Sequence, residues 1–409
     1  MKTAIKEIKV GLDFGSGVQS VGRLAIRNGI IYFEYDNDFL QTELEISPIK
    51  LPLQRGVIGL PRDPFEGLAG VFNDSLPDGW GRLLFDRMLR SEGILPSEVT
   101  PLDRLAHVGL HGLGALVYEP DESPNFDDEI IDLDVLASQT KEVLEGNSDE
   151  VIAELLALNG SSAGARPKAL IGVDKERKNI SFGAHQLSDG FEPWMVKFPN
   201  SQDGNDSGAI EYVYALMAKE AGIAMPNVHL FSSQKGNGYF AVKRFDREGN
   251  ERLHMHTVSG LIHSNFRFPS LDYEDLLSLT SYLTKDIREV EKMFRLAVFN
   301  VMAHNQDDHA KNFSFLMNEL GEWKLSPAYD LTFSNGPGGE QSTMVLGEGR
   351  NITVKHLSKL GEEAQLSKEF IENVIEQTLS ALGKWQSLSK KYGVSDVNMQ
   401  LISKTISKF

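Results

Sequence analysis

The sequence predicts an α+β protein in which a β-rich N-terminal part precedes a mostly helical C-terminal part. Segments with the two-residue alternation of strands are concentrated before residue 247. After that point the apolar spacing becomes helical, in REVEKMFRLAVFNVMAH and in the tail from about Ser367. A third observation is a polar loop in AHNQDDHAKNFSFL, residues 303 to 316, between an apolar helix and an apolar strand.

Composition limits the class of protein. The chain has 409 residues, enough for two or three cores, and its hydrophobic content of 41% and charged content of 24% are ordinary for a soluble protein. It has no cysteine, which excludes disulfides and thiolate metal sites. The formal net charge of −17 opposes broad contact with nucleic acid. Without a signal peptide or a long apolar run, we expect a cytoplasmic protein with no membrane span.

The first segment, 1–120, is predicted to be a β-rich subdomain. RLAI and IIYFEYD flank Asn28-Gly29, a pair that tolerates the positive φ of a tight hairpin turn. GWGRLLFDRML reads as a helix start. From 121 to 150 the chain has eleven Asp or Glu residues against the single Lys141, which indicates an acidic linker or helical surface.

The segment 151–247 is predicted to alternate helices and strands. EVIAELLAL is helical, and the loop NGSSAGARPKA leads into the strand ALIGV. In the strand PWMVKF, alternation places Lys197 on the face opposite Trp194, Val196 and Phe198. A helix, GAIEYVYALMAKEAG, and a strand, YFAVKRF, follow. The remainder, 248–409, is predicted to be mainly helical.

The polar loop lies in an order of elements that recurs in protein kinases. An apolar helix ends near Met302, the loop follows, and FSFLM, NELGE and WKLSPAYD read as strand, turn and strand ending at Asp330. Asp307 and Asn312 are five residues apart, the spacing of the aspartate and asparagine in the kinase catalytic loop. A carboxylate can orient the attacking hydroxyl, while an amide oxygen and Asp330 hold Mg²⁺. We therefore predict a two-lobed protein-kinase-like fold.

Upstream residues are candidates for the other roles. Lys197 would pair with nucleotide phosphates, and Glu211 on the next helix would hold this lysine in place. The alternatives are an exposed edge charge for Lys197 and a helix-dipole role for Glu211. The loop GSSAGARPK has small residues whose N–H groups can approach phosphates, or it is a flexible surface turn.

The polar loop also contains two histidines, His304 and His309. A zinc site would use His304 and His309 with Asp307 or Asp308, but five residues is a poor helical spacing for two ligands, so we do not expect one. His309 alone either braces the loop or takes part in catalysis. Asp308 is expected to face solvent.

At this point the residues resemble a family, the HipA-like serine/threonine kinase toxins of bacterial toxin–antitoxin systems. The motifs GARPKALI, VKRFDR, DDHAKNFSF and LSPAYDL occur in the family's order. The stretches GRLAIRNGIIYFEYDNDFL, SPIKLPL, VFNDSLPDGWGRLL and GLGAL look like its N-terminal subdomain. The resemblance covers roughly residues 20 to 335.

The resemblance implies a set of site residues. Asp307 would be the catalytic aspartate, and Lys197 would pair with the phosphates of ATP. Asn312 and Asp330 would hold Mg²⁺. Ser161, or the adjacent Ser162, would be autophosphorylated, which would eject the loop from the nucleotide site. The remaining nucleotide-binding residues would be the loop residues Ser162, Ala163, Gly164, Ala165 and Lys168 and the hinge residues Lys243 and Phe245.

The resemblance also implies partners. Characterised members phosphorylate an aminoacyl-tRNA synthetase, notably glutamyl-tRNA synthetase. They pair with the helix-turn-helix antitoxin HipB, so DNA is reached only through the antitoxin. The chain departs from the family in LHMHTVSG, residues 253–260, where a HQED-like run is frequent, and in Lys243, where many members have Glu.

Two rival functions remain. VGLDFGSG, residues 10 to 17, looks like the first phosphate motif of actin-like sugar kinases, but no second such loop is evident, and Asp13 is more simply a turn residue. The other rival is a catalytically silent member that binds a DNA-binding antitoxin as co-repressor. The intact set of Lys197, Asp307, Asn312 and Asp330 argues against it.

Overall fold

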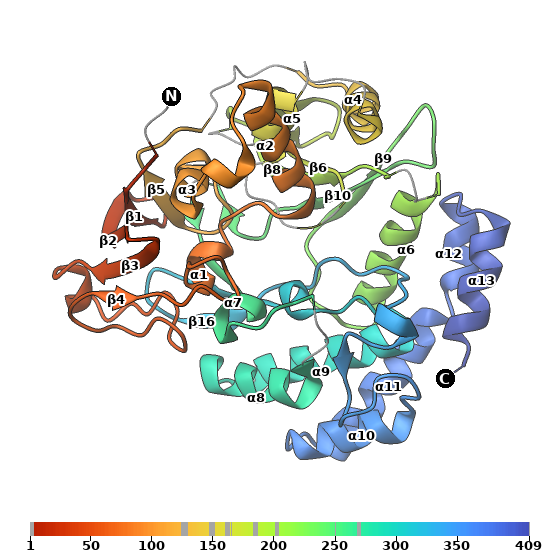
Figure 1. Cartoon of the computed structure of the whole chain (residues 1–409). Helices are drawn as coiled ribbons and strands as arrows, with labels where there is room; N and C mark the ends of the chain where they lie inside the picture. The colour runs from red at the N-terminus through yellow and green to blue at the C-terminus, as the bar shows by residue number, and fades with distance from the viewer. Residues whose placement is uncertain are drawn as a thin grey trace. The chain divides into compact units, whose positions relative to one another are not determined.

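The structure, a computed structural model, describes residues 4–123, 130–146, 152–159, 164, 166–182, 187–200, 204–249, 251–267 and 271–408. The chain forms two compact units (Figure 1). The first comprises residues 1–203, 241–263 and 316–322, and the second comprises 204–240, 264–315 and 323–409. Among the described residues, none of the helices has the length and apolar content needed to cross a bilayer.

The first unit begins with an antiparallel sheet of order β4-β3-β2-β1-β5. Its strands are β1 (Glu7–Asp13), β2 (Val18–Arg27), β3 (Ile30–Tyr35), β4 (Ile58–Gly59) and β5 (Leu116–Glu119). The predicted hairpin is confirmed: Arg27 pairs with Ile30 around Asn28 and Gly29, whose φ angles are 51° and 76°. Alternate residues of the strands, such as Leu24 and Phe33, are fully buried. The first, second and third strands lie side by side in Figure 1.

Short helices accompany this sheet in the sequence. They are η1 (Phe39–Gln41), α1 (Gly70–Asn73), α2 (Gly79–Ser91), η2 (Pro96–Glu98) and α3 (Pro101–Val108). The predicted helix in GWGRLLFDRML is therefore present as α2. Thr100 caps α3 by accepting from the Asp103 N–H, and Pro101 suits its first turn. The acidic segment contains α4 (Leu133–Glu145), capped by Asp132, and α5 (Ile152–Asn159) follows.

A second sheet in this unit contains strands in the order β7-β6-β8-β10. They are β6 (Lys168–Asp174), β7 (Ile180–Phe182), β8 (Phe191–Lys197) and β10 (Tyr239–Lys243). The alternation predicted for β8 is confirmed, since Trp194, Val196 and the following Phe198 are buried while Lys197 is half-buried. The unit also contains β11 (Arg247–Glu248), β12 (Glu251–Arg252), β13 (His254–Thr257) and α7 (Val258–Ile262).

The second unit is mostly helical. It contains α6 (Ser207–Glu220), β9 (Val228–Phe231), β14 (Leu271–Asp272), α8 (Tyr273–Thr284) and α9 (Ile287–Met302). The chain continues through η3 (Ala310–Asn312), β15 (Ser314–Met317), β16 (Trp323–Leu325), η4 (Pro337–Gly339) and β17 (Thr343–Met344). β14 and β17 pair in parallel.

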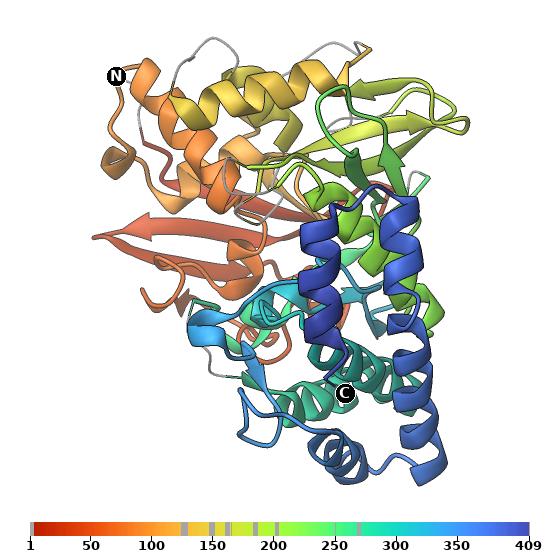
Figure 2. The same cartoon turned by 90° about the vertical axis from the view of Figure 1, so that its right-hand side faces the viewer.

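Four helices complete the second unit: α10 (Val354–Glu363), α11 (Lys368–Leu382), α12 (Trp385–Lys391) and α13 (Asp396–Ile406). Both views show α12 and α13 side by side at the C-terminal end (Figures 1 and 2). Asp206 fixes the start of α13, because its carboxylate accepts from the Ser395 N–H at 2.8 Å and from Asn398 Nδ2 at 2.9 Å. The fold is thus mixed, with a β-rich N-terminal region and helices in the C-terminal part, as predicted.

Candidate active site

The polar loop begins where the buried helix α9 ends. Val290, Phe294 and Val298 are all at most 3% exposed, which confirms that the core buries this helix. Tyr214 in α6 donates its hydroxyl to the Ala303 carbonyl at 2.7 Å, and the Asn305 N–H bonds to the Asn300 carbonyl at 2.8 Å. His304, with φ of 55°, turns the chain out of the helix. These contacts fix the position at which the loop starts.

Asp307 and Asn312 are joined directly. The Asn312 side-chain amide donates to the Asp307 carbonyl oxygen at 2.7 Å, and the Asp307 N–H donates to Ser334 Oγ at 3.1 Å. The Asp307 peptide is therefore held on both sides while its residue remains exposed. Because the NH₂ of Asn312 donates to the carbonyl, its Oδ1 is the side-chain atom that could accept a cation.

Asp330 belongs to a segment that is anchored to the same loop on both sides. On one side, the Tyr329 hydroxyl donates to the Lys311 carbonyl at 2.7 Å and bonds to Ser314 Oγ at 2.5 Å. On the other side, Ser334 contacts Asp307. Asp330 itself has φ of 57°, a sharp turn between the two anchors. The structure thus brings Asp330 to the loop that carries Asp307 and Asn312.

The donor set suits magnesium. Mg²⁺ prefers a few carboxylate and carbonyl oxygens together with water and phosphate oxygens. Asp330 and Asn312 offer a carboxylate and an amide oxygen on half-buried side chains, which leaves room for such additional ligands. These residues therefore fit the ion that the sequence predicts.

The candidate phosphate-binding residues lie in the first unit. Lys168 and Lys197 are paired across β6 and β8, so their side chains leave the same face of the sheet. Gly164 has φ of +112°, a conformation that favours glycine, and a β-carbon there would lie 2.5 Å from Lys168 Nζ, so the end of this lysine would have to move. Two lysines on one face of a sheet are a pattern that suits phosphate groups, and their role in nucleotide binding stays a prediction.

Gly164 is held by the start of α2. Its N–H donates to Asp78 Oδ1, and its carbonyl accepts from the Trp80 N–H at 3.0 Å. The N-terminal motif LPDGWGRLL thereby fixes the one described residue of the GSSAGA loop. Ser161, Ser162, Ala163 and Ala165, predicted for nucleotide binding or autophosphorylation, lie outside the described residues.

The predicted hinge residues lie at the end of β10, with Lys243 as its last residue and Phe245 two residues later. Lys243 pairs with Trp194 across the strands, and its Nζ contacts Glu192 Oε1 at 2.7 Å. This hydrogen bond lowers the pKa of Glu192. The Lys243 side chain thus lies on the face opposite Lys197, and contact of its backbone with adenine stays a prediction. Phe245 is half-buried. Glu211 is buried in α6 of the second unit, and its pairing with Lys197 stays a prediction.

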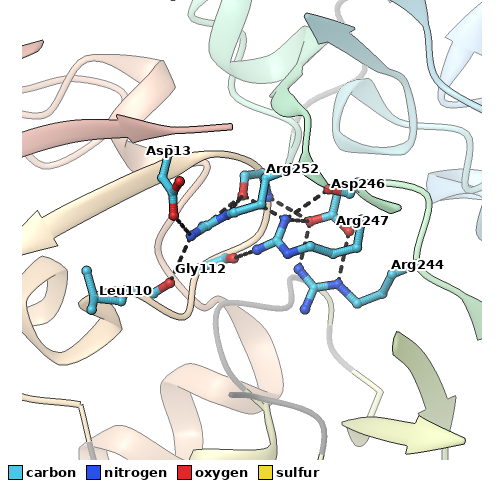
Figure 3. Close-up of polar contacts among 8 residues, drawn as sticks. Asp13, Leu110, Gly112, Arg244, Asp246, Arg247 and Arg252 are labelled. Atoms are coloured by element: carbon cyan, nitrogen blue, oxygen red, sulfur yellow. Dashed lines mark hydrogen bonds and ion pairs between the residues drawn. The ribbon is translucent and has the colours of Figure 1, made fainter. Parts of the chain in front are cut away.

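The VKRFDR motif forms a buried ion cluster (Figure 3). Asp246 accepts from Arg244 Nη2 and Arg247 Nη1, each at 2.7 Å, and from the Gly114 N–H. Burial opposes its ionisation, but the two guanidinium groups outweigh burial and hold the pKa of Asp246 well below its usual range. Arg252 joins the cluster through Asp13 at 3.2 Å and the Gly114 carbonyl at 3.0 Å.

Asp13 is a turn residue as expected, because its carboxylate accepts from the Gly15 N–H at 2.8 Å as well as from Arg252. Its contacts account for VGLDFGSG without a phosphate ligand. The actin-like interpretation of this stretch therefore has no support in the local geometry.

The segment LHMHTVSG, residues 253–260, which differs from the family pattern, forms hydrogen bonds with the N-terminal subdomain. His256 Nδ1 lies 2.6 Å from Asp74 Oδ2, and its Nε2 lies 2.9 Å from Ser47 Oγ. Asp74 also accepts from the Thr257 N–H at 2.8 Å, and His254 Nε2 bonds to the Ile46 carbonyl at 2.8 Å. Burial lowers the pKa of His254 to about 3, so this ring is neutral. His254 and His256 are fully buried, so both rings pack within the unit.

Two expectations for the polar loop need comment. The expectation that Asp308 faces solvent is wrong: its exposure is 0%. Burial raises the pKa of Asp308 to about 7, against hydrogen bonds from Tyr273, Gln341 and the Thr343 N–H that lower it. Among the described residues, no group of three or more His, Asp or Glu side chains is placed to hold a metal ion, and the expectation against a zinc site stays a prediction. His304 bonds to Asn335, whereas the His309 ring packs on Phe266.

Sequence reasoning missed Ser334, Tyr273 and Asn300, which contact the loop or its neighbours. The signal for Tyr273 and Asn300 is weak, since both lie in helices with ordinary amphipathic patterns. Ser334, four residues after Asp330, is a polar residue in a loop and has no distinguishing pattern.

A buried helix, an aspartate–asparagine loop, two short strands and a second aspartate held against that loop are the elements of the kinase-like fold. That is the class of protein defined by the fold and the loop. A model of the HipA-like C-terminal domain matches residues 160–385, and a model of the HipA N-terminal domain matches residues 15–119. The chain therefore belongs to the HipA-like family.

Relatives agree with this assignment. The chain is 24% identical over 394 residues to the protein named "Putative kinase Y4mE" from Sinorhizobium fredii, covering 88% of this chain and 87% of that protein. It is 26% identical over 191 residues to "Putative kinase Y4dM" from the same organism, covering 43% of this chain and only 44% of the relative. Its fold is similar to HipA from Shewanella oneidensis, solved with HipB and operator DNA, with a TM-score of 0.69, 16% identity and coverage of 97% and 95%.

Proposed function

We propose that this protein is an ATP- and Mg²⁺-dependent protein serine/threonine kinase that acts as the toxin of a toxin–antitoxin pair. The observation that carries the proposal is the loop in which Asn312 donates to the Asp307 carbonyl while Asp330 is anchored beside it. This arrangement leaves one exposed carboxylate and a separate set of oxygen ligands, which phosphoryl transfer requires.

Each residue has a defined task in this mechanism. Asp307 orients the attacking hydroxyl and accepts its proton. Asn312 Oδ1 and Asp330 would supply oxygen ligands to the cation, and Lys168 and Lys197 would offset phosphate charge. Bound magnesium–ATP supplies the transferable phosphoryl group and part of the charge neutralisation. Because the peptide of Asp307 is fixed at both its N–H and its C=O, little reorganisation is needed when the hydroxyl arrives.

The finer parts of the proposal rest on family likeness. The protein substrate is proposed to be an aminoacyl-tRNA synthetase, and Ser161 (or Ser162) is proposed to be the self-phosphorylated residue. The partner is proposed to be a HipB-like helix-turn-helix antitoxin, in line with the Shewanella HipA that was solved with HipB and operator DNA. A net charge of −17 supports contact with DNA only through that antitoxin.

The test compares the native protein with Asp307→Ala in labelled ATP and bacterial lysate. We expect one dominant labelled band together with self-labelling, both lost in the variant. Asp189→Ala, which removes an exposed aspartate from the turn before β8, is the matched control and should label as the native protein does. Equal labelling by Asp307→Ala would remove the catalytic assignment.

The self-phosphorylation step has its own test. Ser161→Ala should abolish most self-labelling while ATP binding, followed by calorimetry, stays intact. Phosphate found by mass spectrometry on a distant residue would refute the loop-switch proposal. The rival function, a silent co-repressor, predicts no thermal shift with ATP and Mg²⁺, whereas a kinase with a competent nucleotide site should be stabilised.

A further inference from the structure

A chain of hydrogen bonds runs from the catalytic loop into the core of the second unit. The Asp307 N–H donates to Ser334 Oγ at 3.1 Å, and the Ser334 hydroxyl donates to Asn305 Oδ1 at 2.9 Å. The Asn305 amide then donates to Asn300 Oδ1 at 3.0 Å. Three links therefore connect the proposed catalytic residue to the helix α9.

The chain continues to a buried carboxylate. The Asn300 amide donates to the Tyr273 hydroxyl at 3.0 Å, and this hydroxyl donates to Asp308 Oδ2 at 2.5 Å. The Thr343 N–H occupies the other oxygen, Oδ1, at 3.1 Å. Asp308, the residue next to Asp307 in sequence, is thus the final acceptor of a path that starts at Asp307.

All these bonds point in one direction. Each group donates to the next and accepts from the previous one, and the Asn312 amide that donates to the Asp307 carbonyl adds a further donor at the outer end. Aligned hydrogen bonds polarise one another, and the effect is larger where the surroundings exclude water. Asn300 and Asn305 are each 2% exposed, and Tyr273 and Asp308 are fully buried.

The direction follows from the groups at each link. Tyr273 donates its one hydroxyl proton to Asp308 Oδ2, so the tyrosine oxygen is left to accept from the Asn300 amide. Because the Asn300 nitrogen is the donor, its oxygen accepts from the Asn305 amide, and the Asn305 oxygen accepts from the Ser334 hydroxyl. The Ser334 oxygen then accepts from the Asp307 N–H.

We propose that Asp308 and Tyr273 are positioning residues that fix the peptide of Asp307, and with it the aim of the Asp307 carboxylate, through Asn300, Asn305 and Ser334. The proposal rests on the proposed kinase function for its effect on rate, but the coupling itself is a property of the fold. Asp308 is assigned no contact with the reacting atoms, because it is fully buried whereas Asp307 is exposed.

The kinetic test interrupts the chain at its two ends. Tyr273→Phe and Ser334→Ala should each lower the maximal rate of self-labelling about 10–100-fold, the range expected when a catalytic group is misplaced by a fraction of an ångström to an ångström. The ATP concentration for half-maximal rate should change less than about threefold, because nucleotide contacts are untouched. Ser334→Thr, which keeps the hydroxyl, should recover most of the rate.

The double variant is the decisive case. If the groups act as one path, Tyr273→Phe combined with Ser334→Ala should be little slower than either single variant. Losses that multiply would show independent local roles and overturn the proposal. Ser389→Ala, which removes a fully buried hydroxyl bonded to the Trp385 carbonyl in α12, is the control for general loss of packing and should keep the native rate.

Amide hydrogen exchange separates this proposal from the kinase assignment. In peptides covering 303–309, Tyr273→Phe should speed exchange of the Asp307 N–H, although the substitution is several links away. Faster exchange in a protein that labels nothing would uphold the coupling and refute the kinase function. Native exchange in Tyr273→Phe, whatever the activity, would refute the coupling.

Discussion

Asp308 gives the most quantitative prediction. Its folded pKa is raised to about 7 from 3.8, because burial disfavours the charged form. Between about pH 4 and pH 7 the unfolded chain has lost this proton while the folded chain retains it, so unfolding releases a proton and becomes easier as pH rises. Each pH unit in that window lowers the free energy of unfolding by about 1.4 kcal/mol, and the whole shift amounts to about 4 kcal/mol.

The perturbation is Asp308→Asn, which keeps the size of the side chain but cannot ionise. Urea unfolding of both proteins at pH 5, 6, 7 and 8 gives the difference in free energy of unfolding at each pH, and other titrating groups cancel in that difference. The native protein should lose about 2–3 kcal/mol relative to the variant between pH 5 and pH 8, with the curve flattening above pH 7. A difference independent of pH would show that Asp308 is ionised throughout, and the reasoning from burial would be refuted.

Two further predictions concern the first unit. Asp74→Asn should lower the free energy of unfolding by about 2–4 kcal/mol in urea titration, because the carboxylate accepts from His256, the Thr257 N–H and the Thr257 hydroxyl in a buried site. The control is Asp36→Asn, at an exposed hydrogen bond to Ser20, which should lower it by less than about 1 kcal/mol. A similar loss in both variants would contradict this difference. Gly164→Ala should weaken ATP binding, measured by calorimetry, at least about tenfold, because its β-carbon would displace Lys168 Nζ. The control is Gly190→Ala, which is also at positive φ (+92°) but has open space around it and should bind ATP normally. Unchanged affinity in Gly164→Ala would argue against a nucleotide role for Lys168.

Local features of the site could be predicted from the sequence because they depend on neighbouring residues. The five-residue spacing of Asp307 and Asn312 allows one side chain to reach back to the other's carbonyl, and the structure has this bond. The hairpin at Asn28-Gly29 and the face on which Lys197 lies follow from turn chemistry and strand alternation in the same way.

The contacts that the sequence did not predict involve partners distant in sequence. The sequence shows two consecutive aspartates, and nothing local indicates that Asp308 meets Tyr273, 35 residues earlier. His256 pairs with Asp74 at a separation of 182 residues. No spacing rule covers such contacts, because they arise only when separate elements pack. A buried carboxyl group in particular needs hydrogen-bond partners, and those of Asp308 come from two distant segments, Tyr273 in α8 and Gln341 with Thr343.

The arginine cluster around Asp246 has a consequence for dissecting the chain. The two domain models end and begin at residues 119 and 160, which invites expression of the C-terminal portion alone. Yet Gly112, Gly114 and Asp13 contribute carbonyls and a carboxylate to Arg247 and Arg252 within one compact unit. A fragment starting near residue 150 would lack these hydrogen-bond and ion-pair partners of Arg247 and Arg252. The shortest fragment expected to adopt the native fold of this unit therefore includes the N-terminal sheet.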